Sequence, residues 1–393
     1  MKLQLKATVV AIVVLATASL AATGTPAAPA RTSAFPSNGQ LAWVNPTGPC
    51  EASDPCGKVV VANPDGKARR TIHLPWDASY PVWSPDGSKL LVIARRPNLP
   101  PRPAIVNPDG SDLTVLDPPN LGLGSPFELG CTSWSPDGTR LLCAAVNGGP
   151  GGGAGLFTLR ASDGGDPIRL TTAPPGYYDG YAKYSPDGTR IAFIRAVDGD
   201  MSTGAIFVAN ADGTKPQRVT DYGVPMSGGL EGLNWSPNGT EIIFMAQPWS
   251  LDTIHPDGTG LHELVHGQDG CPCAMDPTFS PDGTHIAFAN STPSDTDIFT
   301  ANADATDPID ITNTPDSHEL EPNWGTHPLA PACTAAEKAK RAKALATYKR
   351  HMAAERRAYF RTHHAAKARA AFAKAQRAKL KRLERRVKAC AGT

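Results

Sequence analysis

Short apolar runs separated by polar turns recur along most of the chain. The clearest unit is an aromatic residue, the tetrapeptide Ser-Pro-Asp-Gly and a second apolar run, as in residues 83–87 followed by residues 90–93. In such a tetrapeptide proline presets φ for a tight turn, the Asp carboxylate accepts hydrogen bonds from the turn backbone, and glycine supplies a positive φ. The pattern therefore predicts a β-hairpin at each copy of the unit.

The unit occurs five times at a nearly constant spacing. Its aromatic residues stand at positions 83, 134, 184, 235 and 279, so that successive copies are 51, 50, 51 and 44 residues apart. The residues that stand between proline and glycine in the turns are Asp86, Asp137, Asp187, Asn238 and Asp282. Two more apolar segments follow each hairpin, as at residues 205–208 and 217–220. Four short strands in about 45 to 50 residues are typical of one propeller blade.

The two ends of the repeat region predict how the ring of blades closes. Before position 83 the chain has apolar runs for only three strands, at residues 40–44, 58–62 and 70–74, and after the fifth repeat it has one orphan strand at residues 319–325. Joining these segments completes one more blade and removes the open sheet edges. We therefore predict an all-β, six-bladed β-propeller over residues 35–327, closed by N- and C-terminal strands and followed by an α-helical basic tail.

The repeat resembles that of the TolB-like six-bladed β-propeller family, which is related in form to WD40-like repeats. The resemblance rests on the Trp-Ser-Pro-Asp-Gly turn and on the strands that follow it, such as Ile191-Ala192-Phe193 and Ile286-Ala287-Phe288. It implies a propeller of the cell envelope that binds other proteins at its funnel. TolB itself also carries an α/β domain ahead of the propeller, and the sequence predicts none here.

Residues 1–30 have the pattern of an export signal and lead-in. Lys2 and Lys6 precede an apolar stretch at residues 7–20, and small residues stand at its end. This is the arrangement of a secretory signal peptide, and the apolar stretch is shorter than a membrane-spanning helix. We predict a secreted or periplasmic cell-envelope protein with no transmembrane segment in the mature chain.

The chain has eight cysteines, an even number that suits pairing in an oxidising compartment. Cys131 and Cys143 lie on either side of a predicted hairpin turn, so they are expected to face each other across two strands. The disulfide candidates are Cys50 with Cys56, Cys131 with Cys143, and Cys333 with Cys390; the pairing of Cys271 and Cys273 is left open.

Residues 262–266 read His-Glu-x-x-His, the pattern of zinc proteases. That chemistry needs a helix, which brings both imidazoles to one metal ion. Here the segment follows an Asp-Gly turn at the place of a last blade strand, where residues four apart are about 13 Å from each other. We predict a strand, and we assign no catalytic residue, metal or cofactor to the chain.

Acidic residues recur three to six positions before the repeat aromatics, near the start of the strand closest to the propeller axis. They are Asp77, Glu128, Asp179, Glu231, Asp276, Glu319 and Glu321. A ring of carboxylates at the funnel mouth would focus negative potential and could hold a cation or a basic partner. The alternative is that these residues cap turns and keep the surface soluble.

The C-terminal segment, residues 334–390, contains no proline or glycine and is dominated by Ala, Lys and Arg, which favour helices. Residues 334–393 carry 19 Lys and Arg against 3 Glu, a net charge of +16, and the rest of the chain carries 19 against 34, a net charge of −15. The tail is predicted either as one helix of about 80 Å or as a helical hairpin that bends near residues 362–364.

These observations predict a non-catalytic binding or scaffold protein that acts through the propeller funnel and the basic tail. The expected partner is an envelope protein or an anionic envelope polymer, or the acidic propeller itself through self-association with the basic tail. Export makes nucleic acid an unlikely partner class. The alternative function is a propeller enzyme, a glycan lyase or hydrolase with a metal or carboxylate site in the funnel.

Overall fold

The structure is a computed structural model. It describes residues 38–46, 57–118, 121, 127–147, 155–197, 200–224, 232–246, 249–266, 273–291, 295–315 and 317–326, together with parts of residues 343–380. The predicted signal segment, residues 1–30, lies outside the described residues. No helix in the described ranges is long and apolar enough to span a membrane.

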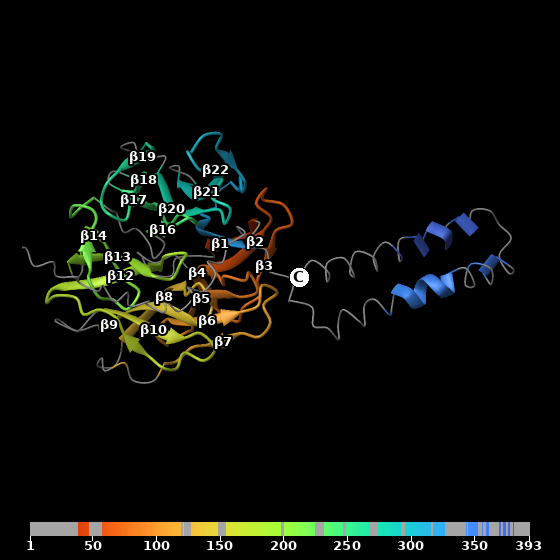
Figure 1. Ribbon diagram of the computed structural model, residues 1–393, viewed down its shortest axis with the longest axis horizontal. Helices are drawn as coiled ribbons and strands as arrows, with labels where there is room; N and C mark the ends of the chain where they lie inside the picture. The colour runs from red at the N-terminus through yellow and green to blue at the C-terminus, as the bar shows by residue number, and fades with distance from the viewer. Residues whose placement is uncertain are drawn as a thin grey trace, which may run out of the picture. The chain divides into compact units, whose positions relative to one another are not determined.

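The described residues form 24 strands in five hydrogen-bonded sheets, four of four strands and one of eight. The eight-stranded sheet consists of two four-stranded groups that a single residue pair, Gly57 opposite Ala78, joins through β2 and β4. Divided at this pair, the strands form six groups of four, which we number as blades 1 to 6 (Figure 1).

The blades have the following strands. Blade 1 is β24 (Leu320–Thr326), β1 (Asn38–Pro46), β2 (Gly57–Ala62) and β3 (Arg70–Thr71); blade 2 is β4 (Asp77–Trp83), β5 (Leu90–Arg95), β6 (Arg102–Val106) and β7 (Thr114–Val115). Blade 3 is β8 (Phe127–Trp134), β9 (Arg140–Asn147), β10 (Gly155–Arg160) and β11 (Ile168–Arg169); blade 4 is β12 (Tyr177–Tyr184), β13 (Arg190–Val197), β14 (Asp200–Asn210) and β15 (Gln217–Arg218). Blade 5 is β16 (Leu233–Trp235), β17 (Ile242–Ala246), β18 (Ser250–Ile254) and β19 (His262–Val265); blade 6 is β20 (Cys273–Phe279), β21 (His285–Ser291), β22 (Thr296–Asn302) and β23 (Ile309–Asp310).

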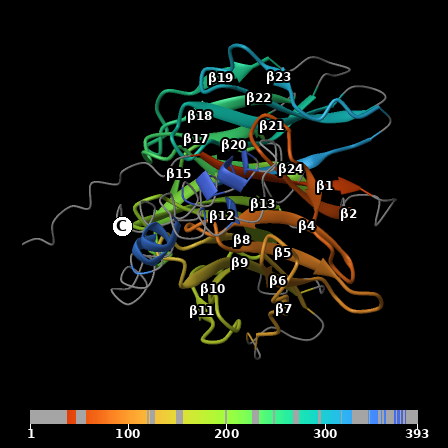
Figure 2. The ribbon, with the colours of Figure 1, turned by 90° about the vertical axis from the view of Figure 1, so that its right-hand side faces the viewer.

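Figure 2 shows the last strands β7, β11, β19 and β23 toward the outside of the ring. The first strands of successive blades, such as β20, β24 and β4, contact one another. The propeller fold that the repeats predict is therefore confirmed, and residues 262–265 form a strand, as predicted for the His-Glu-x-x-His segment.

Strands from the two ends of the described propeller close the ring. β1 pairs antiparallel with β24, with Leu41 opposite Trp324 and Ala42 opposite Asn323. β2 and β3 extend the same blade. The prediction that three N-terminal strands and one C-terminal strand complete one blade is thus confirmed.

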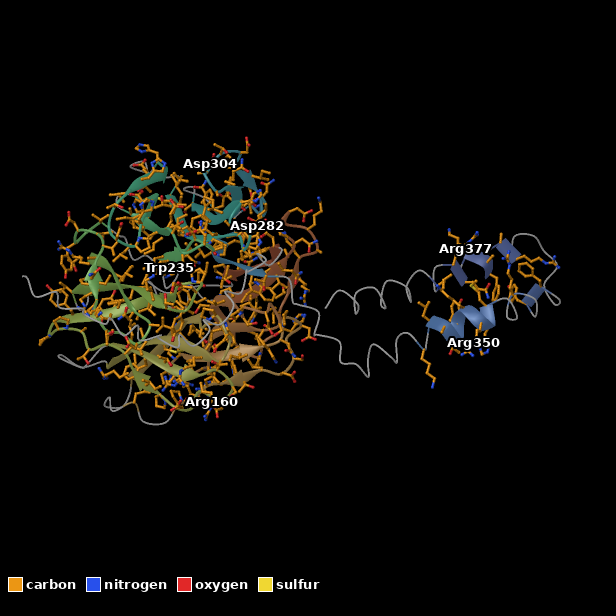
Figure 3. All side chains as sticks on the ribbon, viewed as in Figure 1. Arg160, Trp235, Asp282, Asp304, Arg350 and Arg377 are labelled. Carbon is orange, nitrogen blue, oxygen red and sulfur yellow. A yellow bond between two sulfur atoms is a disulfide. The ribbon has the colours of Figure 1, made fainter. Side chains whose placement is uncertain are left out.

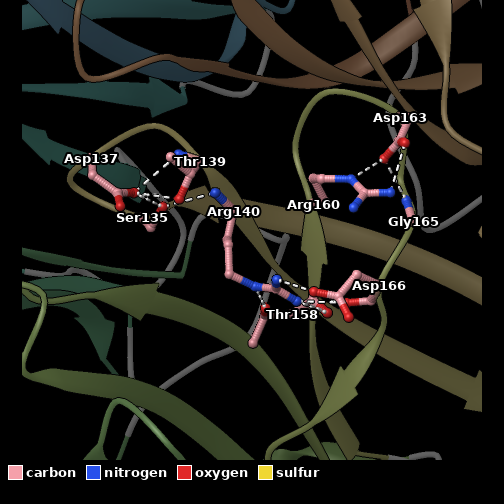
Figure 4. Close-up of polar contacts among 9 residues, drawn as sticks. All are labelled: Ser135, Asp137, Thr139, Arg140, Thr158, Arg160, Asp163, Gly165 and Asp166. Atoms are coloured by element: carbon pink, nitrogen blue, oxygen red, sulfur yellow. Dashed lines mark hydrogen bonds and ion pairs between the residues drawn. The ribbon is translucent and has the colours of Figure 1, made fainter.

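Hydrogen bonds to one carboxylate hold each Ser-Pro-Asp-Gly turn, as Figure 4 shows for blade 3. Asp137 Oδ1 accepts hydrogen bonds from Ser135 Oγ at 2.6 Å, from the Thr139 amide at 3.0 Å and from Thr139 Oγ1 at 2.8 Å. Gly138 takes the positive φ, 71°, that the turn requires. The hydrogen bonds from Ser135 and Thr139 outweigh partial burial and lower the pKa of Asp137. The same contacts occur in the other four turns, at Asp86, Asp187, Asn238 and Asp282.

Cys131 and Cys143 form a disulfide between β8 and β9, as predicted. Cys273 is also disulfide-bonded. The candidate pairs Cys50 with Cys56 and Cys333 with Cys390 lie outside the described residues.

Replacing both Cys131 and Cys143 with alanine is expected to lower the free energy of unfolding by about 2–3 kcal/mol, because the bond restricts the unfolded chain. Urea unfolding of the oxidised protein and of the double variant measures the difference. Adding a reductant should shift the unfolding midpoint of the double variant much less than that of the unmodified protein. A double variant as stable as the unmodified protein would contradict the expectation.

The described tail residues are helical and pack against each other in pairs far apart in sequence. Tyr348 Oη donates a hydrogen bond to the Gln376 carbonyl at 3.3 Å, and Gln376 Nε2 donates one to the Met352 carbonyl at 3.0 Å. Tyr359 and Phe372 stack with their ring centroids 4.0 Å apart. In a straight helix residues 348 and 376 would be about 42 Å apart. Tyr348 and Met352 therefore lie beside Gln376, as the hairpin alternative requires and one straight helix excludes (Figure 1).

Candidate functional site

Two of the predicted funnel carboxylates are ion-paired. Asp179, fully buried on β12, accepts hydrogen bonds from Arg195 Nε at 2.6 Å and Arg195 Nη2 at 2.9 Å. Asp77, at the start of β4, accepts a hydrogen bond from Lys58 Nζ of the neighbouring blade at 2.7 Å. The negative charge of each carboxylate is therefore balanced within the fold.

Asp276 and Glu321 link neighbouring blades. The Glu321 amide donates a hydrogen bond to Asp276 Oδ2 at 3.3 Å, and the Tyr80 amide donates one to Glu321 Oε2 at 2.5 Å. Asp276, Glu321 and Tyr80 each stand three residues before a repeat aromatic and have positive φ values of 52°, 60° and 55°. A bulge interrupts strand pairing at each place. These two carboxylates thus join the first strands of blades 6, 1 and 2.

Glu319 is buried and incompletely hydrogen-bonded. Its Oε1 accepts a hydrogen bond from Ser317 Oγ at 3.1 Å, whereas its Oε2 has no partner among the described residues. Burial raises the pKa of Glu319 above its ordinary value of 4.5, and repulsion from Asp297 acts in the same direction. The ionised carboxylate is therefore a cost to the folded state.

The variant Glu319→Gln is expected to be more stable than the unmodified protein at pH 7, by about 1 kcal/mol. The raised pKa means that the contribution of Glu319 is most favourable below pH 4.5 and is lost as the pH rises through the folded pKa. The difference should accordingly disappear in acid. Thermal melting of both proteins at pH 7 and in acid measures it, with the exposed Asp221→Asn as a control that should show little change. A Gln variant that is less stable at pH 7 would contradict this expectation.

The remaining predicted carboxylates cannot be placed at the funnel by their side chains. The Glu128 backbone belongs to β8 but its side chain is outside the description, and Glu231 lies outside the described residues. Within the described part of the chain, no group of three or more His, Cys, Asp or Glu residues could hold a metal ion. The described carboxylates occupy separate structural positions, and their role as one binding ring stays a prediction.

Negative charge is concentrated in the last third of the propeller. Residues 219–333 contain 17 Asp and Glu and no Lys or Arg. Residues 1–218 contain 17 acidic and 19 basic residues. The net charge of −15 outside the tail therefore comes entirely from this acidic segment, which includes blades 5 and 6. The run without Lys or Arg is visible in the sequence. It is hidden when charge is counted for the whole chain outside the tail, because residues 1–218 contain 19 basic residues.

A cavity of 420 Å³ lies between blades 5 and 6, within the acidic segment. Its charged and ionisable lining residues are Glu241, His262, Asp282 and Asp304, and its apolar lining includes Phe279 and Leu264. Asp282 lies between β20 and β21 and Asp304 between β22 and β23 of blade 6; both are labelled in Figure 3. None of these residues was among the predicted funnel carboxylates, because the cavity forms between turns rather than at the strand starts.

Asp282 supplies a permanent negative charge to this cavity. Burial opposes its ionisation, but hydrogen bonds from Thr284, Ser280 and Asn38 outweigh that cost and lower the pKa of Asp282 to about 2. Asn38, the first residue of β1, donates to Asp282 Oδ2 at 2.9 Å and accepts from the Asp282 amide at 3.1 Å. The carboxylate therefore stays ionised throughout the neutral and mildly acidic range.

Comparison with known proteins bears on the fold. No protein-family model and no curated protein matches the chain. Among solved structures, TolB from Acinetobacter baumannii matches with a TM-score of 0.55 and 18% identity, over 73% of this chain and 66% of that one. Hydrazine synthase from Kuenenia stuttgartiensis matches with a TM-score of 0.54 and 14% identity, over 74% of this chain and 47% of that one. A chain of a nidogen/laminin complex matches with a TM-score of 0.51 and 11% identity, over 73% of this chain and 98% of that one. At these identities the likeness establishes the architecture, and the chain has the TolB-like β-propeller fold that its repeats predict.

Proposed function

We propose that this protein is a secreted, non-catalytic binding or scaffold protein of the cell envelope. The observation that carries the proposal is the division of charge on two folded parts. Residues 219–333 have 17 acidic and no Lys or Arg residues, and the tail, residues 334–393, has a net charge of +16. Surfaces of such uniform sign attract oppositely charged partners and speed their association.

The tail residues in the described helices are well placed for such contacts. The apolar and aromatic side chains Tyr348, Tyr359 and Phe372 pack within the hairpin, whereas Arg350 and Arg377 are exposed. Figure 3 shows these two arginines on different helical stretches, extending away from the hairpin. A folded hairpin that presents arginines outward suits an acidic protein or an anionic envelope polymer.

Export is part of the same proposal. The basic and apolar pattern of residues 1–30 supports it, and so does the disulfide between Cys131 and Cys143, since disulfides persist in oxidising compartments. The alternative function, a glycan lyase or hydrolase, stays a prediction.

Capture of envelope components by the immobilised protein tests the proposed function. The full-length chain is compared with a version that ends at Pro331, and captured material is identified by mass spectrometry and by sugar analysis. We expect the full-length chain to capture a partner that the shortened version loses. Capture by neither protein, or turnover of an envelope glycan by the purified protein, would contradict the proposal.

A further inference from the structure

The interface between blades 4 and 5 contains a guanidinium site that the chain fills itself. Arg190 is the second residue after the turn glycine of blade 4, at the start of β13. Its guanidinium carbon lies 5.0 Å from the centroid of the Trp235 ring, and its Nη2 donates a hydrogen bond to the Gly239 carbonyl at 3.2 Å. Trp235 and Gly239 both belong to the Ser-Pro-Asn-Gly unit of blade 5. An aromatic face and a turn carbonyl thus hold the guanidinium.

The next interface, between blades 5 and 6, repeats this geometry. Pro186 Cδ lies 3.7 Å from the position of a Cβ atom built on Gly239, and Pro237 Cδ lies 3.7 Å from the corresponding position on Gly283. By repeat position Phe279 replaces Trp235, and Gly283 replaces Gly239. The aromatic face and the turn carbonyl are therefore both present again.

The residue that fills the site differs in charge between the two interfaces. The counterpart of Arg190 is Glu241, which is also the second residue after its turn glycine. Near Gly239, Arg190 Nη2 lies 3.8 Å from the Cβ position, whereas near Gly283 only Pro237 atoms, among the described residues, lie within 4 Å. At this repeat position a carboxylate has thus replaced the guanidinium.

The 420 Å³ cavity lies at this place. Glu241, Phe279 and Gly283 line it, and Asp282 and Asp304 add two more carboxylates. Phe279 is buried and the acidic segment supplies no Lys or Arg of its own. A planar cation suits the aromatic ring, the carboxylates and the turn carbonyl of this cavity. It can stack on the ring and donate paired hydrogen bonds to carboxylate and carbonyl oxygens.

A related pairing occurs at the interface between blades 6 and 1. His285, the second residue after Gly283, lies with its ring centroid 6.3 Å from that of Trp324, the aromatic residue of blade 1. The position after the turn glycine thus places a nitrogen-bearing group on the next aromatic ring at this interface as well.

Arg140, at the same position in blade 3, instead bonds Thr158 and Asp166 of its own blade, so the pairing belongs to particular interfaces. At the interface between blades 5 and 6, Glu241 supplies no cation to Phe279.

We propose that the cavity between blades 5 and 6 binds the guanidinium group of an arginine side chain supplied in trans or by the tail. The inference deepens the proposed binding function, on which it rests, by naming the chemistry that one surface recognises. The tail offers ten arginines within residues 334–393. Arginine on another protein is the second source of the same group.

Binding of Nα-acetyl-arginine amide to the full-length protein, followed by titration calorimetry or NMR, tests the site, with Nα-acetyl-lysine amide as the matched probe. The arginine probe should bind at least about fivefold more tightly, because the lysine ammonium lacks the planar donor set. Equal affinity for the two probes overturns the proposal, and so does the absence of arginine-probe binding both to the full-length protein and to a full-length variant in which the ten tail arginines are lysine. The measurement uses purified protein alone, so its outcome is separate from that of envelope capture.

Two variants of Glu241 locate the site. Glu241→Arg restores the arginine that the repeat has in Arg190 and should abolish probe binding, with the melting temperature unchanged or raised. Glu241→Gln should weaken binding about threefold to tenfold and tests the same site if the arginine variant is less stable. Glu263→Arg, the same charge change in the acidic segment but outside the cavity lining, should keep at least half of the affinity. Wild-type affinity in both Glu241 variants overturns the proposal.

A full-length variant in which all ten tail arginines are lysine distinguishes the sources of the group. If the tail occupies the cavity, this variant should bind the arginine probe more tightly than the unmodified protein. Equal affinity in the two proteins assigns the site to an arginine of another protein. Either result, tighter or equal probe binding, supports a guanidinium site only if the Glu241→Arg variant has lost binding of the arginine probe.

Discussion

Replacing Asp179 with alanine is expected to lower the free energy of unfolding by about 3–5 kcal/mol. The Asp179 side chain is fully buried and that of Arg195 is only 13% exposed, so the variant leaves a guanidinium without its two-bond partner. Arginine cannot avoid this cost by losing its proton, and the hydrogen bonds of Asp179 raise the pKa of Arg195 further. Urea unfolding followed by circular dichroism measures the loss.

Asp77→Ala is the matched control for this prediction. Its carboxylate also pairs with one basic residue, but the side chains of Lys58 and Asp77 are 41% and 31% exposed. Ion pairs open to water contribute at most about 1 kcal/mol, so the control should unfold nearly as the unmodified protein does. An equal decrease in the free energy of unfolding in the two variants would show that burial of the Asp179–Arg195 pair does not determine how much the pair stabilises the fold.

Removing β24 is expected to abolish the cooperative fold of the propeller. Trp324 is buried in the cluster that includes Leu41 and Trp43, and Asn323 Oδ1 accepts a hydrogen bond from the Trp83 amide of blade 2. Without the strand, β1 has an exposed edge and blades 6 and 2 lose their common neighbour. The expected loss is about 5 kcal/mol or more, which is comparable to the whole stability of many domains.

The measurement compares two shortened proteins, one that ends at Ser317 and one that ends at Pro331. Both lack the tail, and only the first lacks β24, so the comparison isolates the closing strand. The version ending at Pro331 should melt cooperatively close to the full-length protein. The version ending at Ser317 should show no cooperative transition and rapid amide exchange. A cooperative transition of similar midpoint in both would contradict the closure of the ring by β24.

The fold follows from the sequence because its turns are built from local chemistry. The Ser-Pro-Asp-Gly units contain the donors, the acceptor and the positive-φ residue within one tetrapeptide and its neighbours, as the contacts of Asp137 show. The closure could also be predicted, because three strands at the N-terminal end and one orphan strand at the C-terminal end together make one complete blade. Both kinds of inference need no knowledge of distant side chains.

The candidate sites depend on contacts between residues far apart in the sequence. The sequence therefore predicts the positions of their residues but not the contacts that these residues make. The position of Asp276 near the start of a first strand can be predicted, but the bulge that gives it a positive φ and aims the Glu321 amide at it cannot. The partner of Asp179 is an arginine 16 residues away on the next strand. Glu241 could have been found by aligning the repeats, which exposes the change from Arg190, but its cavity required the structure.

For the tail, too, the sequence predicts the secondary structure but not the contacts between distant residues. Its composition predicts helix at once, and its broken apolar pattern leaves the choice between one helix and a hairpin open. Contacts across 28 residues, between Tyr348 and Gln376, decide for the hairpin. The pairing of Tyr359 with Phe372 next to the reversal gives the hairpin an aromatic contact that the sequence spacing did not suggest.

The salt dependence of binding to the captured envelope partner tests most directly whether oppositely charged surfaces carry the function. The dissociation constant of the full-length protein is measured at about 50 mM and about 500 mM salt, where the Debye length falls from about 14 Å to about 4 Å. The account predicts that affinity falls by about tenfold or more between the two conditions. An affinity that does not change with salt would contradict the claim that charge on blades 5 and 6 and on the tail carries the function.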